Sequence, residues 1–96
     1  MTLQVTYRTV VSITSTNNSM IAKDMKDALN GYLGDNPDKR IGDPSVFPTN
    51  WNSLEVSFHK GRDEAVCRNA IADIMVKLQM PCILTSHYET EVYSNE

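Results

Sequence analysis

The chain has 96 residues, which is the size of one domain, and its 41% hydrophobic and 22% charged residues argue against wholesale disorder. Its formal net charge of −3 is too acidic for a dedicated nucleic-acid binder. No apolar run approaches the roughly 20 residues of a membrane helix, and the N-terminus lacks the layout of a signal peptide. We therefore expect a single domain over residues 1–96, with a cytoplasmic location and no membrane partner.

Three segments alternate between apolar and polar residues, which is typical of strands with one buried face. They cover residues 3–14, 52–60 and 82–93. In the last of these, Ser86 and Thr90 interrupt the apolar side, so its outer half is expected to fray or to lie at a sheet edge. Each segment predicts a strand that faces the core on one side only.

Two segments carry apolar residues at helical spacing. The first follows the cluster Ser-Thr-Asn-Asn-Ser at 15–19, whose side chains are typical helix caps, and it is expected to end near Gly34. The second begins near Asp63 and Glu64 and stops before Pro81. Both predict amphipathic helices that pack against a sheet.

Residues 34–51 follow neither periodicity and hold three of the four prolines. We expect a long irregular loop here, although a connection of this length is uncommon in a compact domain. The apolar residues Ile41, Val46 and Phe47 leave two possibilities open, a short strand within 40–47 or a loop pinned to the body. With such a strand, the element order becomes β-α-β-β-α-β.

The predicted fold class is α+β. We expect a two-layer sandwich in which two helices cover one face of an antiparallel sheet, the arrangement of ferredoxin-like folds. Strands apolar on only one side fit this architecture better than a parallel sheet covered on both faces.

The chain has two cysteines, Cys67 and Cys82, too few for a disulfide scaffold, and both fall on core-facing positions. His59 and His87 fall on the polar side of their strands. Because the two pairs point to opposite sides of the sheet, we predict buried thiols and no metal site.

Catalysis finds little support in the sequence. There is no Gly-x-Ser-x-Gly motif, and the carboxylates Glu55 and Glu89 are expected on an exposed sheet face, where they make poor general acids. The open face of the sheet also lacks the aromatic platform of an RNA-binding domain. We predict no enzymatic activity and no cofactor.

The open sheet face and the long loop remain as candidate interaction surfaces. The face is rich in Ser, Thr, His and Tyr where a solvated face would carry Lys and Glu, and the loop adds cations and large aromatics. The candidate partner-binding residues are Arg8, Lys39, Arg40, Phe47, Trp51, His59, His87 and Tyr93. The alternatives are a merely solvated face and, for Phe47 and Trp51, a position capping the edge of the core, which is favoured for Trp51.

These observations predict a small interaction module that binds or occludes a protein partner, such as a regulator, an inhibitor or an accessory factor of a mobile element. A homodimer through the open sheet face is also expected. One alternative is an enzyme or small-molecule binder in which Arg8, Glu55, His59 and His87 converge under a lid formed by residues 34–50. A second is anion or nucleic-acid contact through Lys39, Arg40, Lys60 and Arg62.

The net charge is concentrated at one end of the chain. Residues 1–88 hold all 9 Lys and Arg and 9 of the 12 Asp and Glu, so they sum to zero, and Glu89, Glu91 and Glu96 supply the surplus. These glutamates are expected either to discourage pairing at the sheet edge or to form an acidic handle for a basic partner.

Overall fold

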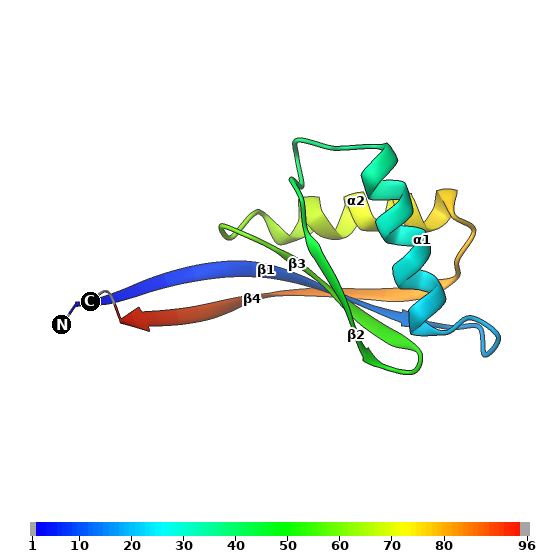
Figure 1. The fold of residues 1–96 in the computed structure, drawn as a ribbon, viewed down its shortest axis with the longest axis horizontal. Coiled ribbons are helices and arrows are strands. Elements are labelled where there is room, and N and C mark those ends of the chain that lie inside the picture. Colours follow the sequence, from blue (N-terminus) through cyan, green and yellow to red (C-terminus); the bar gives the residue numbers. More distant parts are fainter. Residues whose placement is uncertain (1, 95–96) are drawn as a thin grey trace.

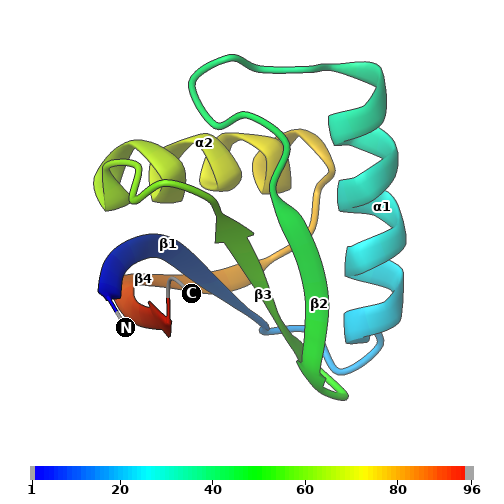
Figure 2. The same cartoon turned by 60° about the vertical axis from the view of Figure 1, so that its left-hand side comes forward.

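The computed structural model describes residues 2–94 and contains two helices and four strands. The elements are β1 (Leu3–Ser15), α1 (Ala22–Asp35), β2 (Ser45–Asn50), β3 (Ser53–Phe58), α2 (Glu64–Lys77) and β4 (Cys82–Ser94). The strands form one antiparallel sheet in the order β2-β3-β1-β4 (Figures 1 and 2). The predicted α+β class is therefore confirmed, and this order is consistent with a ferredoxin-like sandwich.

The core lies between the sheet and the two helices, which share one face of it (Figure 2). Alternate residues of β1 and β3 face the helices, among them Ile13, Leu54 and Phe58, which are fully buried. Along α2, Cys67, Ile71 and Met75 recur at helical spacing and are buried, whereas Val66 is exposed.

The irregular segment is shorter than predicted. Helix α1 runs to Asp35 and β2 begins at Ser45, so residues 36–44 alone connect them. The short strand left open within 40–47 lies instead at Ser45–Asn50 and pairs with β3. Its signal was weak because Pro48 and Asn50 are unfavourable strand residues, tolerated here because β2 is an edge strand.

The predicted helix cap at 15–19 is wrong. Helix α1 begins at Ala22 after Ile21, which makes no side-chain cap. The polar cluster instead closes a turn on itself, because the amide of Ser19 donates to Asn17 Oδ1 at 2.9 Å and the Ser15 hydroxyl donates to the Asn17 carbonyl. Short polar side chains satisfy backbone groups in turns as readily as at helix starts.

The two longest strands extend beyond the rest of the molecule (Figure 1). β1 pairs with β4 from Leu3 to Ser15, but its pairing with β3 begins only at Thr9. The outer half of β4, expected to fray or to lie at a sheet edge, is paired with β1 up to Ser94 and lies at the edge. The molecule measures 50 × 27 × 21 Å because this two-stranded extension projects from the body.

Candidate functional site

We call the extension formed by Leu3–Arg8 and Glu89–Ser94 the ribbon. On the side that faces the helices elsewhere in the sheet, it carries four large apolar side chains, which we call the ribbon's apolar face. Their exposed fractions are 63% for Leu3, 53% for Val5, 57% for Tyr7 and 59% for Val92. The sequence pattern assigned Leu3, Val5 and Tyr7 to the buried side of their strand. The side is right, but each of the three side chains remains more than half exposed.

The covered part of the sheet ends where α2 begins. The Glu64 amide at the start of α2 donates to the Tyr88 hydroxyl at 3.2 Å, and the hydroxyl of buried Thr9 donates to the Arg62 carbonyl. These contacts hold the start of α2 over Thr9 and Tyr88, which are opposite each other on β1 and β4. Beyond this pair the ribbon continues without a covering layer, so its apolar face is left to solvent or to another molecule.

The opposite face of the ribbon carries a network of polar side chains. Arg8 donates to Glu89 Oε2 through Nε at 2.9 Å and Nη2 at 2.6 Å, and its Nε lies 3.2 Å from Glu91 Oε1. His87 Nε2 lies 3.2 Å from Glu89 Oε1, and the Tyr93 hydroxyl donates to Glu91. Three predicted partner-binding residues, Arg8, His87 and Tyr93, are thus brought together by two glutamates.

The network shifts the acid–base behaviour of its members. The hydrogen bond from Arg8, followed by that with His87, holds the pKa of Glu89 below its usual range, and the same contact raises the pKa of Arg8. The hydrogen bond to Glu91 raises the pKa of Tyr93. The charged side chains on this face are therefore paired with one another. Glu89 and Glu91, which were expected to form an acidic handle, both lie against Arg8. Glu96 lies outside the described residues.

Glu55, His87 and Glu89 are the described residues that could hold a cation together, since one ligand atom of each lies within 4.8 Å of the others. They share a face of the sheet with Val10, which is the register partner of His87 and is only 1% exposed. Carboxylate and imidazole ligands suit a divalent metal. However, the bonds from Arg8 occupy Glu89 Oε2 and place a positive charge beside the cluster. His87 and Glu89 therefore belong to the network around Arg8, whose positive charge disfavours a second cation at this cluster.

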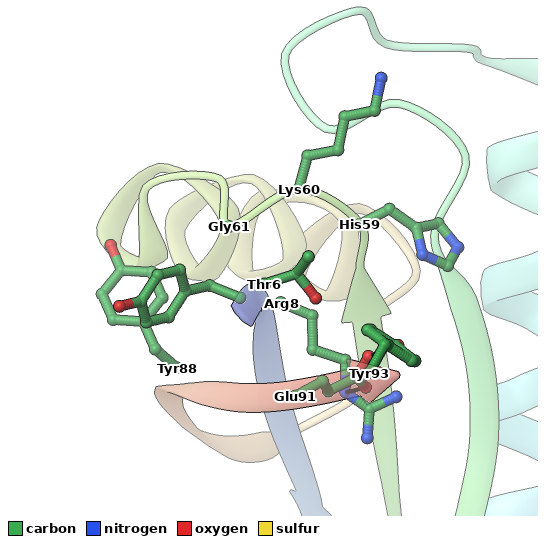
Figure 3. A pocket seen from close by; sticks show the side chains of 9 residues that line it. Thr6, Arg8, His59, Lys60, Gly61, Tyr88, Glu91 and Tyr93 are labelled. Carbon is green, nitrogen blue, oxygen red and sulfur yellow. Dashed lines mark hydrogen bonds and ion pairs between the residues drawn. The ribbon is translucent and has the colours of Figure 1, made fainter. Parts of the chain in front are cut away.

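A hollow of about 890 Å³ lies where the ribbon leaves the body (Figure 3). It is lined by Thr6, Tyr7 and Arg8 from β1, by the turn His59-Lys60-Gly61 and by Tyr88, Glu91 and Tyr93 from β4. Lys60 and Gly61 both have positive φ angles, 67° and 52°, and the turn that they form brings Gly61 beside Tyr7. His59 lines this hollow with Arg8 and does not join the cluster around His87.

The loop residues lie elsewhere. Arg40 donates to both carboxylate oxygens of Asp38, an arrangement that lowers the pKa of Asp38. Arg62 Nη1 donates to the Arg40 carbonyl at 3.1 Å, and Lys39 is exposed. Two of the four cations proposed for anion contact are therefore engaged in contacts within the chain.

Phe47 and Trp51 do not cap the core. Val46 takes the core position on β2, so Phe47 lies on the opposite, open face, half-buried and paired in register with Glu55. Trp51 is 61% exposed in the turn between β2 and β3, where its carbonyl accepts the Ala22 amide at 2.7 Å. The expectation favoured for Trp51 is wrong, because most of its side chain is exposed in this turn.

Residues 36–44 do not form the predicted lid. They lie on the helix side, where Asn36–Arg40 and residues of α2, including Asp73 and Lys77, line a second, smaller hollow. Glu55 and His87 are on the other face of the sheet. Arg8, Glu55 and His87 do approach one another through Glu89, but no segment within residues 2–94 closes over them.

The cysteines are reduced in this structure. Cys67 is buried and Cys82 half-buried, and burial raises the pKa of both thiols. A raised thiol pKa disfavours the nucleophilic thiolate, which agrees with a structural role.

No family model, curated protein or solved structure matched the chain in our comparisons. Among residues 2–94, neither helix has the length and apolarity needed to cross a membrane.

Proposed function

We propose that this protein is a small, non-enzymatic interaction module that binds a protein partner through the apolar face of the ribbon. The observation that carries the proposal is the exposure of Leu3, Val5, Tyr7 and Val92, each more than half exposed, on one side of a projecting arm. Large apolar side chains gathered on a surface typically mark an interaction site. A partner that covers this face would be occluded or held by a part of the chain that stands clear of its body.

The free energy gained by burying these side chains favours a protein surface as the occupant. Complete burial of a valine or leucine side chain contributes roughly 1.5–3 kcal/mol relative to full exposure. The four residues can therefore supply a substantial part of a binding free energy, and Tyr7 is of a residue type enriched where interfaces are strongest. No charged side chain lies on this face of the ribbon, so a partner need not desolvate an ion to reach it.

In this proposal the principal contact surface is the ribbon's apolar face and not the open sheet face. On that face Glu89 and Glu91 already bond to Arg8, His87 and Tyr93. The polar groups of these three side chains therefore have partners within the chain. Trp51 stands apart in the β2–β3 turn and is a second exposed anchor that a large partner could reach.

The test is site-specific photocrosslinking in cells that normally make the protein. A benzophenone amino acid is placed at Val92 in the ribbon or at Val76 on the outer side of α2, a control valine that is 76% exposed. We expect protein adducts from position 92 that are lost when Val5 is also replaced by threonine. Equal adduct yields from the two positions would overturn the proposal.

A further inference from the structure

The sheet has three stretches of unpaired strand edge, along β2, along β4 and along part of β1, and the first two carry residues that disfavour pairing in part of their length. β2 contains Pro48, which has no amide to donate, and the ribbon part of β4 carries Glu89 and Glu91. The third stretch is the edge of β1 beyond Thr9, where β3 has ended. Its residues from Leu3 to Tyr7 are Leu-Gln-Val-Thr-Tyr, with neither charge nor proline.

The hydrogen-bond pattern identifies the backbone groups that face this free edge. Ser15 donates to Asn52, its partner in the register with β3, and Thr16 donates to Pro81, its partner in the register with β4. In an antiparallel strand the amide and carbonyl of one residue point to the same side, and the side alternates along the chain. Odd-numbered residues of β1 therefore bond toward β3 and even-numbered residues toward β4. The amides and carbonyls of Leu3, Val5 and Tyr7 face the free edge.

We propose that a second copy of this chain pairs with that edge, β1 against β1, antiparallel about a two-fold axis at Val5. The proposal rests on the interaction function proposed for the ribbon and names one partner. Val5 of each copy lies opposite Val5 of the other, and Leu3 of each lies opposite Tyr7. In this register Val5–Val5 and Leu3–Tyr7 are pairs of the hydrogen-bonded type, the Gln4–Thr6 pairs between them are of the other type, and opposite residues point to the same face, as antiparallel pairing requires.

The side chains are self-complementary in this register. On the apolar side, Val92 and Val5 of one copy continue into Val5 and Val92 of the other, because Val92 is the partner of Val5 on β4. On the opposite side Gln4 meets Thr6. No like charges are opposed. Pairing β4 with β4 about a two-fold axis at Thr90 would instead place Glu89 of each copy opposite Glu91 of the other, which is destabilising.

The shape of the molecule permits the assembly. β1 runs from the tip of the ribbon into the body, so an antiparallel mate has its body beyond the tip of the first copy (Figure 1). The two bodies thus lie at opposite ends of a shared sheet. At each end, the incoming Leu3 approaches Tyr7 beside Gly61, which carries no side chain, and beside the hollow that these residues line (Figure 3).

Disulfide trapping tests the register. In a Cys82→Ala background, with Cys67 left buried, Val5→Cys is compared with the matched control Val92→Cys. Facing residues of a hydrogen-bonded pair have Cα atoms about 5.5 Å apart, within disulfide range, whereas the two Val92 positions would be about 14 Å apart across three strand spacings. We expect mild oxidation to convert Val5→Cys to a covalent dimer and to leave Val92→Cys monomeric.

Sedimentation equilibrium of the unmodified chain provides a readout independent of cysteine chemistry. We expect the mass to rise from 10.8 kDa toward twice that value with concentration. Val5→Pro should keep the monomer mass, because it removes an amide that faces the free edge and none that bonds β4. Monomer mass for the unmodified chain up to about 1 mM, or equal oxidation of the two cysteine variants, would overturn the proposal. The interaction function would survive that result if position 92 still crosslinked to another protein.

Discussion

Val5 and Val92 are directly opposite each other on β1 and β4, and both side chains are more than half exposed. A facing pair of β-branched residues normally packs under a covering layer. Here the covering layer stops at the start of α2, which lies over Thr9 and Tyr88. Val5 and Val92 lie four residues farther along their strands, toward the tip of the ribbon. The position of this pair distinguishes the ribbon from the body of the sheet.

Truncation of apolar side chains should separate the two regions. Leu29→Ala, in the buried part of α1, is expected to lower the free energy of unfolding by about 2–5 kcal/mol, because it leaves a cavity in the core. Leu3→Ala removes the same atoms from an exposed site and should cost under about 1 kcal/mol in dilute solution. Urea denaturation of both variants measures the difference, and equal losses would show that the ribbon face is buried.

The Arg8–Glu89 pair should stabilise the ribbon weakly. Both side chains are about one-third exposed, so solvent screens the contact despite its two short hydrogen bonds. A double-mutant cycle with Arg8→Gln and Glu89→Gln is expected to give a coupling energy of roughly 0.2–1 kcal/mol. The coupling should fall at high salt. A coupling indistinguishable from zero at low salt would contradict the contact.

The same pair makes stability depend on pH in a defined direction. The pKa of Glu89 is lower in the folded chain than its ordinary value of 4.5, so folding favours the charged form. This contribution is complete above that ordinary value and is lost as the pH falls through the lower folded pKa. Denaturation midpoints of the unmodified chain and of Glu89→Gln should therefore converge from about pH 6 to about pH 3. Midpoints that diverge on acidification would reverse the assignment.

The turn after β3 should be intolerant of a side chain at Gly61. Its φ of 52° is unfavourable for other residues, and an added Cβ would lie 3.1 Å from Tyr7 Cβ. Gly61→Ala is expected to cost roughly 1–2 kcal/mol of stability, whereas Gly31→Ala, in open space within α1, should be neutral or stabilising. Thermal denaturation compares the two, and a neutral Gly61→Ala would contradict the turn geometry.

The thiols should differ in reactivity. Burial raises the pKa of both, but Cys67 is buried and Cys82 only half-buried. We expect a disulfide reagent at neutral pH to modify Cys82 first, with both thiols slower than in the denatured chain. Reaction of Cys67 ahead of Cys82 would show that α2 does not seal the core as described.

Alternation and helical spacing were sufficient to predict both helices, three of the four strands and the α+β class. The remaining strand, β2, carries Pro48 and escaped detection because its existence depends on pairing with β3. The start of α1 was missed because capping side chains also stabilise turns, and the cluster at 15–19 forms a turn.

The candidate site was harder to predict for a different reason. Alternation shows which side of a strand is apolar, but it does not show whether a helix reaches far enough to cover that side. Alternation alone therefore predicts Leu3, Val5 and Tyr7 as core residues and leaves the polar face as the candidate surface. One signal was present in the sequence. β1 and β4 are each 13 residues long, whereas each helix has 14 residues at less than half the rise per residue and can cover only part of such strands.

Amide hydrogen exchange at Val5 tests most directly whether the free edge of β1 is a binding surface for a second copy. The Val5 amide faces the free edge, while the neighbouring Thr6 amide bonds toward β4 and serves as an internal reference. We predict that Val5 exchanges rapidly in dilute solution and becomes protected as the chain is concentrated, with Thr6 protected throughout. An unprotected Val5 amide at every concentration, beside a protected Thr6, would contradict pairing through this edge.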